Sequence, residues 1–129
     1  MDKLILLPLL LISTISFGQA RLGYTKGQLI DTYETPGTKH HSIILEDDTE
    51  CIFTQLVNGN SIYHYFDKTT HLSKSAAFLF DKKDRDYIIL LCDTNYTKVS
   101  KNHWTYKTMD ITLKKDQNGQ YEYLWFYTR

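Results

Sequence analysis

Short apolar runs separated by polar turns dominate the chain after residue 40. Four turn sequences stand out, EDDTE at 46–50, NGN at 58–60, DKKDRD at 81–86 and DQNGQ at 116–120, and each lies between apolar runs of strand length. The Asn-Gly pairs within NGN and DQNGQ accept the positive φ of tight hairpin turns. We therefore predict six or seven strands, at residues 43–45, 51–57, 61–66, 76–80, 87–92, 109–113 and 121–127.

Two of these runs differ in how their apolar residues are spaced. Residues 109–113 alternate between apolar and polar side chains, which indicates a strand near an edge of the sheet with one buried and one wet face. The run YIILLC at 87–92 is apolar at every position, a pattern typical of a central strand that is covered on both faces. Residues 94–108 show neither period, and they fit a long loop or a short helix followed by a strand.

One helix is predicted ahead of the strands. Thr25 is a good N-cap, and the side chain of Gln28 stands where it completes a capping box. Leu29, Ile30 and Tyr33 supply an apolar stripe, and the sequence TPG then ends the helix after about ten residues. The predicted fold class is α+β, with an N-terminal helix packed on a six- to seven-stranded, mainly antiparallel sheet.

The beginning of the chain has the order of a signal peptide. Lys3 precedes an apolar run at residues 4–15, and small residues follow that run. Gly18 and Ala20 fit cleavage after Ala20, while Ser16 and Gly18 fit cleavage after Gly18. The apolar run is shorter than the ~20 residues that span a bilayer, which favours a cleaved signal over a membrane anchor.

These features predict two parts, a signal peptide at 1–20 and a single α+β domain at 21–129 that is periplasmic or secreted. No cysteine follows the predicted cleavage region closely, so we expect no lipid anchor. The chain has 15 basic and 15 acidic residues, and the signal contains one of each, so the domain is close to neutral. We expect no nucleic-acid partner, because such a protein would present a basic excess, and no membrane span in the mature chain.

The two cysteines, Cys51 and Cys92, leave two alternatives open. An exported protein meets an oxidising compartment, in which the two thiols can form a disulfide. Free cysteine also packs as a small hydrophobic residue, so two separate buried thiols in strands fit the sequence as well.

Aromatic residues gather near the end of a chain that has 10 Tyr and 2 Trp. In YEYLWFY at 121–127, strand alternation places an aromatic row on one face of the sheet. Tyrosine and tryptophan are enriched in protein interfaces, because each combines a large apolar ring with a polar group. We therefore expect a face that binds another protein, as an adaptor or an inhibitor, comprising Trp104, Tyr121, Tyr123, Trp125 and Tyr127.

Catalytic and metal-binding motifs give little support to other functions. None of the five histidines falls into a recognised ligand spacing, and we expect no metal and no cofactor. The GxSxG and SxxK motifs of nucleophilic enzymes are missing, so no catalytic residue is predicted. The alternative function is a small periplasmic hydrolase or ligand-binding protein, with a polar site built from His64, His71, His103 and nearby acids.

The segment around the predicted helix resembles the opening motif of the SmpA/OmlA outer-membrane assembly lipoproteins, which are similar in fold to the β-lactamase-inhibitor proteins. That motif runs roughly G-M-T-x-x-Q-V-x-x-x-L-G-x-P. The segments YHYF at 63–66 and FLFDKKDR at 78–85 are similar to the family's aromatic strand and to its strand followed by an acidic turn. The positions in register with the motif are Gly23, Thr25, Gln28, Leu29, Tyr33 and Pro36, with Glu34 in place of the second glycine.

This resemblance implies an envelope protein that binds other proteins through a sheet face, without a cofactor. Two features depart from the family: its lipidated cysteine is missing, and the segment that contains Trp104 lies beyond the motif. The FGQ sequence at 17–19 also resembles the ends of signal peptides in small exported Bacteroidetes proteins.

Overall fold

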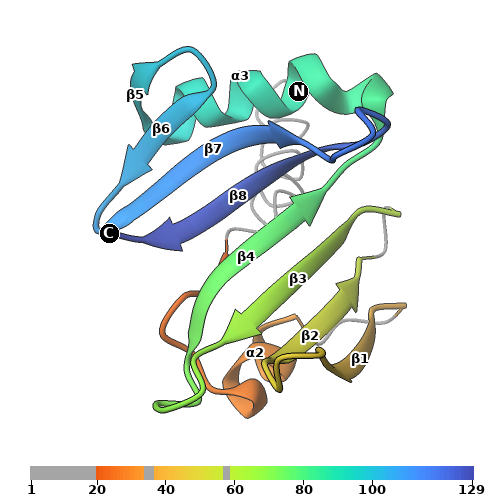
Figure 1. The fold of residues 1–129 in the computed structure, drawn as a ribbon. Coiled ribbons are helices and arrows are strands. Elements are labelled where there is room, and N and C mark those ends of the chain that lie inside the picture. The colour runs from red at the N-terminus through yellow and green to blue at the C-terminus, as the bar shows by residue number, and fades with distance from the viewer. Residues whose placement is uncertain (1–19, 34–36, 57–58) are drawn as a thin grey trace, which may run out of the picture.

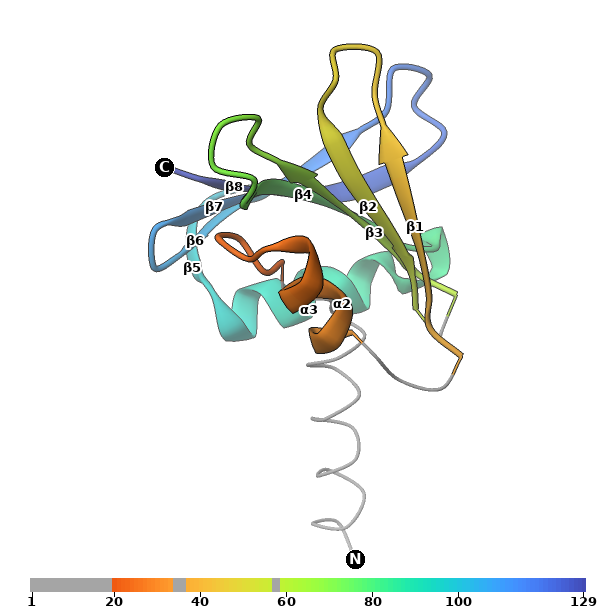
Figure 2. The ribbon, with the colours of Figure 1, turned by 90° about the horizontal axis from the view of Figure 1, so that it is seen from below.

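The computed structural model describes residues 20–33, 37–56 and 59–129. These residues form one eight-stranded antiparallel sheet with two helices on one of its faces (Figure 1, Figure 2). A 3₁₀ turn at Lys82–Asp84 leads into the second helix. In chain order the helices and strands are α2 (Lys26–Thr32), β1 (Lys39–Ile44), β2 (Glu50–Gln55), β3 (Ser61–Phe66), β4 (Ser73–Leu79), α3 (Arg85–Asn95), β5 (Thr97–Ser100), β6 (His103–Tyr106), β7 (Met109–Lys115) and β8 (Glu122–Thr128).

The strand order in space is β1-β2-β3-β4-β8-β7-β6-β5. Strands β1 to β4 therefore form one meander, and strands β5 to β8 form a second one that runs back toward the first. The two meanders join where β4 pairs with β8, from Ser75 opposite Tyr127 to Leu79 opposite Tyr123. The α+β class and the antiparallel sheet are as predicted, whereas the predicted number of six or seven strands is wrong.

The hydrophobic core lies between the sheet and the two helices. We call the sheet face that carries α2 and α3 the inner face, and the opposite one the outer face; Figure 2 shows both helices on the same side. Leu29 of α2 and Ile88 of α3 belong to the same buried cluster as residues from both meanders. The strand members of this cluster are Ile52, Ile62, Phe66, Ala76, Phe78, Trp104, Ile111, Leu113, Leu124 and Phe126.

The predicted capping box is present at the start of α2. The Gln28 amide donates to Thr25 Oγ1 at 3.2 Å, and the Thr25 amide donates to Gln28 Oε1 at 2.9 Å. Thr35 and Pro36 of the predicted stop signal lie outside the described residues, while Gly37 is described and has a φ of 89°. This helix is not the first part of the described fold, because residues 20–25 precede it without helix or strand, and α3, with 11 residues against 7, is the longer of the two helices on the sheet.

The segment from Ala20 to Tyr24, which turns at Leu22 and Gly23, is hydrogen-bonded to Ser73 at the start of β4. Gly23 N–H donates to the Ser73 carbonyl at 2.7 Å, and Ser73 N–H donates to the Tyr24 carbonyl at 2.8 Å. The Ser73 hydroxyl donates to the Arg21 carbonyl and accepts from the Tyr24 amide at 3.1 Å. One buried serine therefore holds the chain against the sheet before α2 begins.

The prediction of a central strand at residues 87–92 is wrong, since this segment is the middle of α3. Ile88 and Cys92, four residues apart, are buried, whereas Tyr87 and Leu90 are 45% and 59% exposed. This is the periodicity of a helix with one face on the core. The preceding DKKDRD sequence, predicted to be a turn between strands, forms the 3₁₀ turn and the first residues of α3.

Two further predictions about strands need correction. The strand at 109–113 is not near an edge, because β7 pairs with β6 on one side and with β8 on the other. Alternation of apolar and polar residues shows only that one face of a strand is exposed to solvent. An interior strand also has such a face when one side of its sheet is uncovered. For residues 94–108 the sequence fits either a long loop or a short helix followed by a strand. The structure has the end of α3 there, followed by the hairpin of β5 and β6.

The glycine turn signals are confirmed where the structure describes them. Gly59 and Gly119 have φ angles of 88° and 69°, between β2 and β3 and between β7 and β8. Asn58 and nearly all of the predicted signal peptide lie outside the described residues. In the part of the chain that the structure describes, no helix has both the length and the apolar character needed to cross a membrane.

Candidate functional site

Alternation along β3 and β8 places aromatic side chains on the outer face. Tyr63 and Tyr65 are partly exposed, while their neighbours on β3 are buried. On β8, the aromatic residues Tyr123, Trp125 and Tyr127 are partly exposed in the same way, and Leu124 and Phe126 are buried in the core. Neither α2 nor α3 lies on this side of the sheet (Figure 2).

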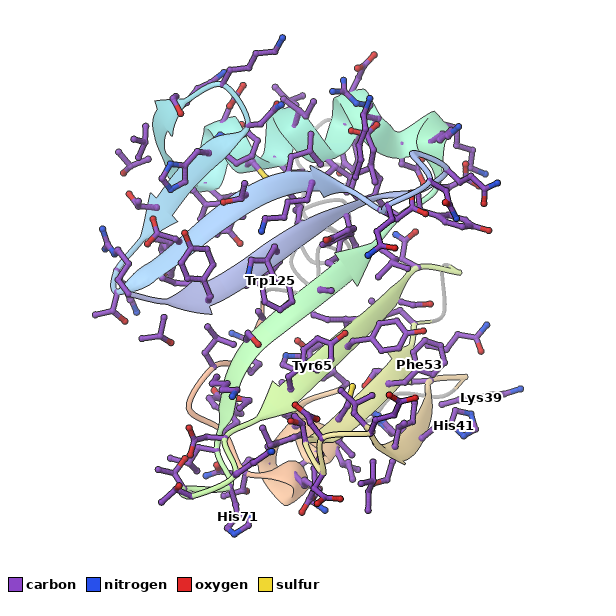
Figure 3. The ribbon with its side chains drawn as sticks, in the orientation of Figure 1. Lys39, His41, Phe53, Tyr65, His71 and Trp125 are labelled. Atoms are coloured by element: carbon purple, nitrogen blue, oxygen red, sulfur yellow. The ribbon has the colours of Figure 1, made fainter. Side chains whose placement is uncertain are left out.

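The rings on the outer face pack against one another across the strands. The ring centroids of His41 and Phe53 are 6.0 Å apart, and those of Phe53 and Tyr63 are 4.8 Å apart. Tyr65 and Trp125 lie 5.8 Å apart, although their strands are separated by β4. Figure 3 shows this row extending from Trp125 to His41 on the edge strand β1, with Lys39 beyond it. We call it the aromatic face.

A small residue on β4 allows Tyr65 and Trp125 to meet. Ala77 lies opposite Tyr63 on one side and opposite Trp125 on the other. Because its methyl group is short, a shallow depression of about 310 Å³ opens above it. The depression is lined by Tyr63, Tyr65, Ala77, Leu79, Asp116, Tyr121, Tyr123 and Trp125.

Charged groups flank the aromatic face. The ammonium of Lys114 lies 5.9 Å from the centroid of Trp125, in reach of a cation–π interaction. The carboxylate of Asp110 lies 2.8 Å from His103 Nε2 and 3.6 Å from Arg129 Nε. Asp116 accepts a hydrogen bond from the Tyr121 amide at 2.8 Å. The acids next to the rings are therefore engaged within the chain.

Two ionisable groups beside the rings have raised pKa values and are neutral near pH 7. Burial, reinforced by neighbouring groups, raises the pKa of the Tyr65 hydroxyl to about 12. Burial also raises the pKa of the Cys51 thiol, which lies in register with Tyr65, to about 11. A thiol of this kind is a poor nucleophile, because the thiolate is the reactive form. Tyr65 and Cys51 are thus suited to contact and hydrogen bonding rather than to nucleophilic attack.

Four of the five predicted aromatic residues lie on or beside this face. Tyr123, Trp125 and Tyr127 project from β8, and Tyr121, 61% exposed, precedes that strand and lines the depression. Trp104 does not join them: it is 1% exposed and lies in the core between sheet and helices. Its indole N–H donates to Asp93 of α3 at 2.8 Å, which makes Trp104 a structural residue.

The sequence interpretation missed the part of the aromatic face that lies on β1 to β4. Tyr63 and Tyr65 alternate with buried residues in SIYHYF, and the same reasoning that identified β8 would have selected them. Phe53 and His41 carry no such signal, since only the register of β1 and β2 brings them beside Tyr63.

The three histidines of the alternative polar site are not brought together in this fold, although His71 lines a separate depression with Asp48, Glu50 and Asp67. His64 is fully buried on the inner face, His103 lies on β6 beside Asp110, and His71 lies in the turn before β4, away from the aromatic row (Figure 3). Burial, together with the charge of Arg21, lowers the pKa of His64 to about 3, so its ring is neutral. Among the described residues, no group of three or more His, Cys, Asp or Glu side chains is placed to hold a metal ion.

The two cysteines are separate buried thiols. Cys51 lies on the outer face beneath Tyr65, whereas Cys92 belongs to α3 and to the core on the inner face. The sheet therefore stands between them. Of the two alternatives, the structure has free thiols, although Cys92 lies in a helix rather than in a strand.

Comparison of the chain with models of protein families, with curated proteins and with solved structures finds no match. The resemblance to the SmpA/OmlA lipoproteins therefore stays a prediction, and function is inferred from the geometry of the aromatic face.

Proposed function

We propose that this protein is an exported, non-enzymatic protein-binding module, an adaptor or an inhibitor, whose contact surface is the aromatic face. One observation carries the proposal. Two groups of packed rings, His41–Phe53–Tyr63 and Tyr65–Trp125, lie on the side of the sheet opposite α2 and α3. A soluble domain normally covers such a surface or uses it for binding.

The composition of the face fits a protein partner. Interfaces are enriched in tyrosine and tryptophan, and their strongest contacts are rings that fill a pocket on the other partner. Here Trp125 and Tyr65 are held by contact with each other, so little side-chain freedom is lost on binding. The depression above Ala77, with a volume of about 310 Å³, has room for one side chain of the partner.

The test places a photo-reactive amino acid at outer-face positions in the full chain, expressed in cells. Substitution at Tyr63 or Tyr121 is expected to give a discrete cross-linked adduct, because both residues line the depression. Tyr87 of α3 is the matched control for Tyr121, since the two tyrosines are 45% and 61% exposed and Tyr87 lies on the helix-bearing side. Cell fractionation of the same culture locates the protein and tests export.

A second substitution identifies the anchor. Adding Trp125→Ala should weaken capture of the same partner by about 30-fold, as the loss of an aromatic hot spot does. Equal adducts at Tyr121 and Tyr87, or an adduct that Trp125→Ala leaves unchanged, would show that the aromatic face is not the contact surface.

A further inference from the structure

The two edges of the sheet differ in their protection against pairing with another strand. β5 has four residues, its register against β6 shifts between Lys98 and Ser100, and the Lys98 ammonium lies 3.6 Å from Asp93 of α3. Short strands, bulges and lysines are the features by which natural sheets block edge pairing. β1 has six residues in unbroken register with β2, and its one lysine, Lys39, is at the strand's first position.

Large aliphatic side chains lie exposed at the β1 edge. Ile43, Ile44 and Leu45 are 38%, 70% and 38% exposed. These residues alternate between the two faces of the sheet, so a single element packed on one face would not cover them all. A strand added beside β1 would contact side chains on both faces.

Among the described strands, the backbone of β1 pairs with β2 on one side only. Leu45 N–H donates to the Thr49 carbonyl at 2.9 Å, so these residues form a hydrogen-bonded pair at the end of the ladder. Such pairs alternate along antiparallel strands. The backbone groups of His40, Ser42 and Ile44 therefore point away from β2, toward the open side of the sheet.

We propose that two copies of this chain associate through β1, paired antiparallel about a twofold axis at Ser42. In this register Ser42 faces Ser42 of the second copy, and His40 faces Ile44 of the second copy. All three residues whose backbone groups point outward are then paired, which adds about six hydrogen bonds across the interface. An isologous interface of this kind is closed, so association stops at the dimer.

The side chains favour this register over the two registers whose twofold axis lies at His40 or at Ile44. On the outer face, Ile43 lies opposite His41 of the second copy, and Leu45 lies opposite Lys39. The exposed aliphatic groups are thereby covered, and no two charges of the same sign face each other. An axis at His40 would leave Ile44 uncovered and bring Lys39 beside His41, while an axis at Ile44 would leave His40 unpaired.

This pairing would join the two sheets edge to edge, with both aromatic faces on the same side. Its existence does not depend on the proposed function, because the interface is the edge of β1 and the aromatic anchors lie on β3 and β8. Trp125→Ala should therefore leave the dimer intact, which separates failure of one proposal from failure of the other.

The test measures sedimentation of the purified protein, expressed as the full chain, over a concentration series. The natural sequence is expected to dimerise, and Ser42→Pro to weaken dimerisation at least about tenfold, because proline removes an outward N–H from each copy. Ser42→Ala keeps that N–H and should dimerise as before. Ile44→Lys alters a side chain that is 70% exposed, so it should fold normally and also weaken the dimer.

Disulfide trapping tests the register. Ser42→Cys places two new thiols beside each other at the twofold axis, whereas Ile44→Cys places them several residues apart. Mild oxidation should therefore link Ser42→Cys into dimers and leave Ile44→Cys largely monomeric in denaturing gels. A protein that sediments as a monomer throughout the series, or a dimer that neither Ser42→Pro nor Ile44→Lys weakens, would overturn the proposal.

Discussion

The backbone N–H of Arg21 donates a hydrogen bond to Nε2 of His64 at 3.1 Å. The bond joins the segment ahead of α2 to the middle of β3, and it requires an imidazole that carries its proton on Nδ1. His64 is fully buried, with the ring of Tyr33 5.7 Å from it. A proton on Nε2 would remove the acceptor and place a charge in the core.

Stability is therefore expected to fall on mild acidification. The ordinary pKa of histidine, near 6.5, applies in the unfolded chain, while burial and Arg21 lower the folded value to about 3. The unfolded state thus binds the extra proton first, so the contribution of His64 is complete above about pH 6.5 and declines as the pH falls toward 3. Between pH 7 and pH 5 the loss is about 2 kcal/mol.

Urea unfolding at several pH values measures this loss. His64→Gln is the control, because glutamine can accept the Arg21 hydrogen bond without titrating in this range. Its unfolding free energy should vary less between pH 7 and pH 5 than that of the natural sequence, by about 2 kcal/mol. Equal slopes for the two proteins would mean that His64 does not carry the effect.

Trp104 should be the more important of the two tryptophans for stability. Trp104→Phe removes the hydrogen bond to Asp93 and leaves unfilled space in the core, at a cost of about 2 to 3 kcal/mol. Trp125→Phe makes the same change on the partly exposed aromatic face and should cost less than about 1 kcal/mol. Denaturant unfolding of both variants gives the comparison, and similar losses would contradict the assignment of Trp104 to the core.

Ser73 should be needed to hold the segment ahead of α2 in place. Ser73→Ala removes the hydroxyl that bonds the Arg21 carbonyl and the Tyr24 amide, which should destabilise the fold by about 2 kcal/mol. Ser75→Ala is the matched control on the same strand, because Ser75 is also buried and lies on the outer face. Thermal unfolding should separate the two variants, and a loss as large in Ser75→Ala would indicate a general effect of serine on β4.

The two thiols should be unreactive until the protein unfolds. Burial raises the pKa of Cys51 to about 11 and, with the nearby charge of Asp93, the pKa of Cys92 to about 12. A thiol reagent should therefore label the native protein slowly and label two thiols per chain in denaturant. The mass of the protein should not change on reduction. A two-dalton increase on reduction would reveal a disulfide, contrary to the structure.

Local signals explain which parts of the fold were predictable. The reciprocal bonds between Thr25 and Gln28 involve residues three apart, and the turns at Gly59 and Gly119 are encoded within a few residues. The prediction of a strand at 87–92 failed because a short segment that is apolar at every position fits a buried strand and a helix equally well. The four-residue spacing of Ile88 and Cys92, together with the polar residues at both ends of the segment, indicates a helix.

The aromatic face was predictable only within single strands. Alternation identified Tyr123 and Trp125, but their contact with Tyr65 depends on β4 lying between β3 and β8. No local pattern specifies that order. Trp104 was misplaced for a related reason, because aromatic character alone does not tell which face of a strand meets the helices.

The order of the strands also bears on how the chain folds. Every pairing in the sheet joins strands that are neighbours in the sequence, apart from β4 with β8. Hairpins form quickly because their loops are short. The β4–β8 pairing is slower, because it closes a long loop that contains α3 and strands β5 to β7. Formation of the β4–β8 pairing should therefore set the folding rate. Ala76 and Phe126 lie opposite each other in this pairing, so substitutions at these two positions should slow folding most.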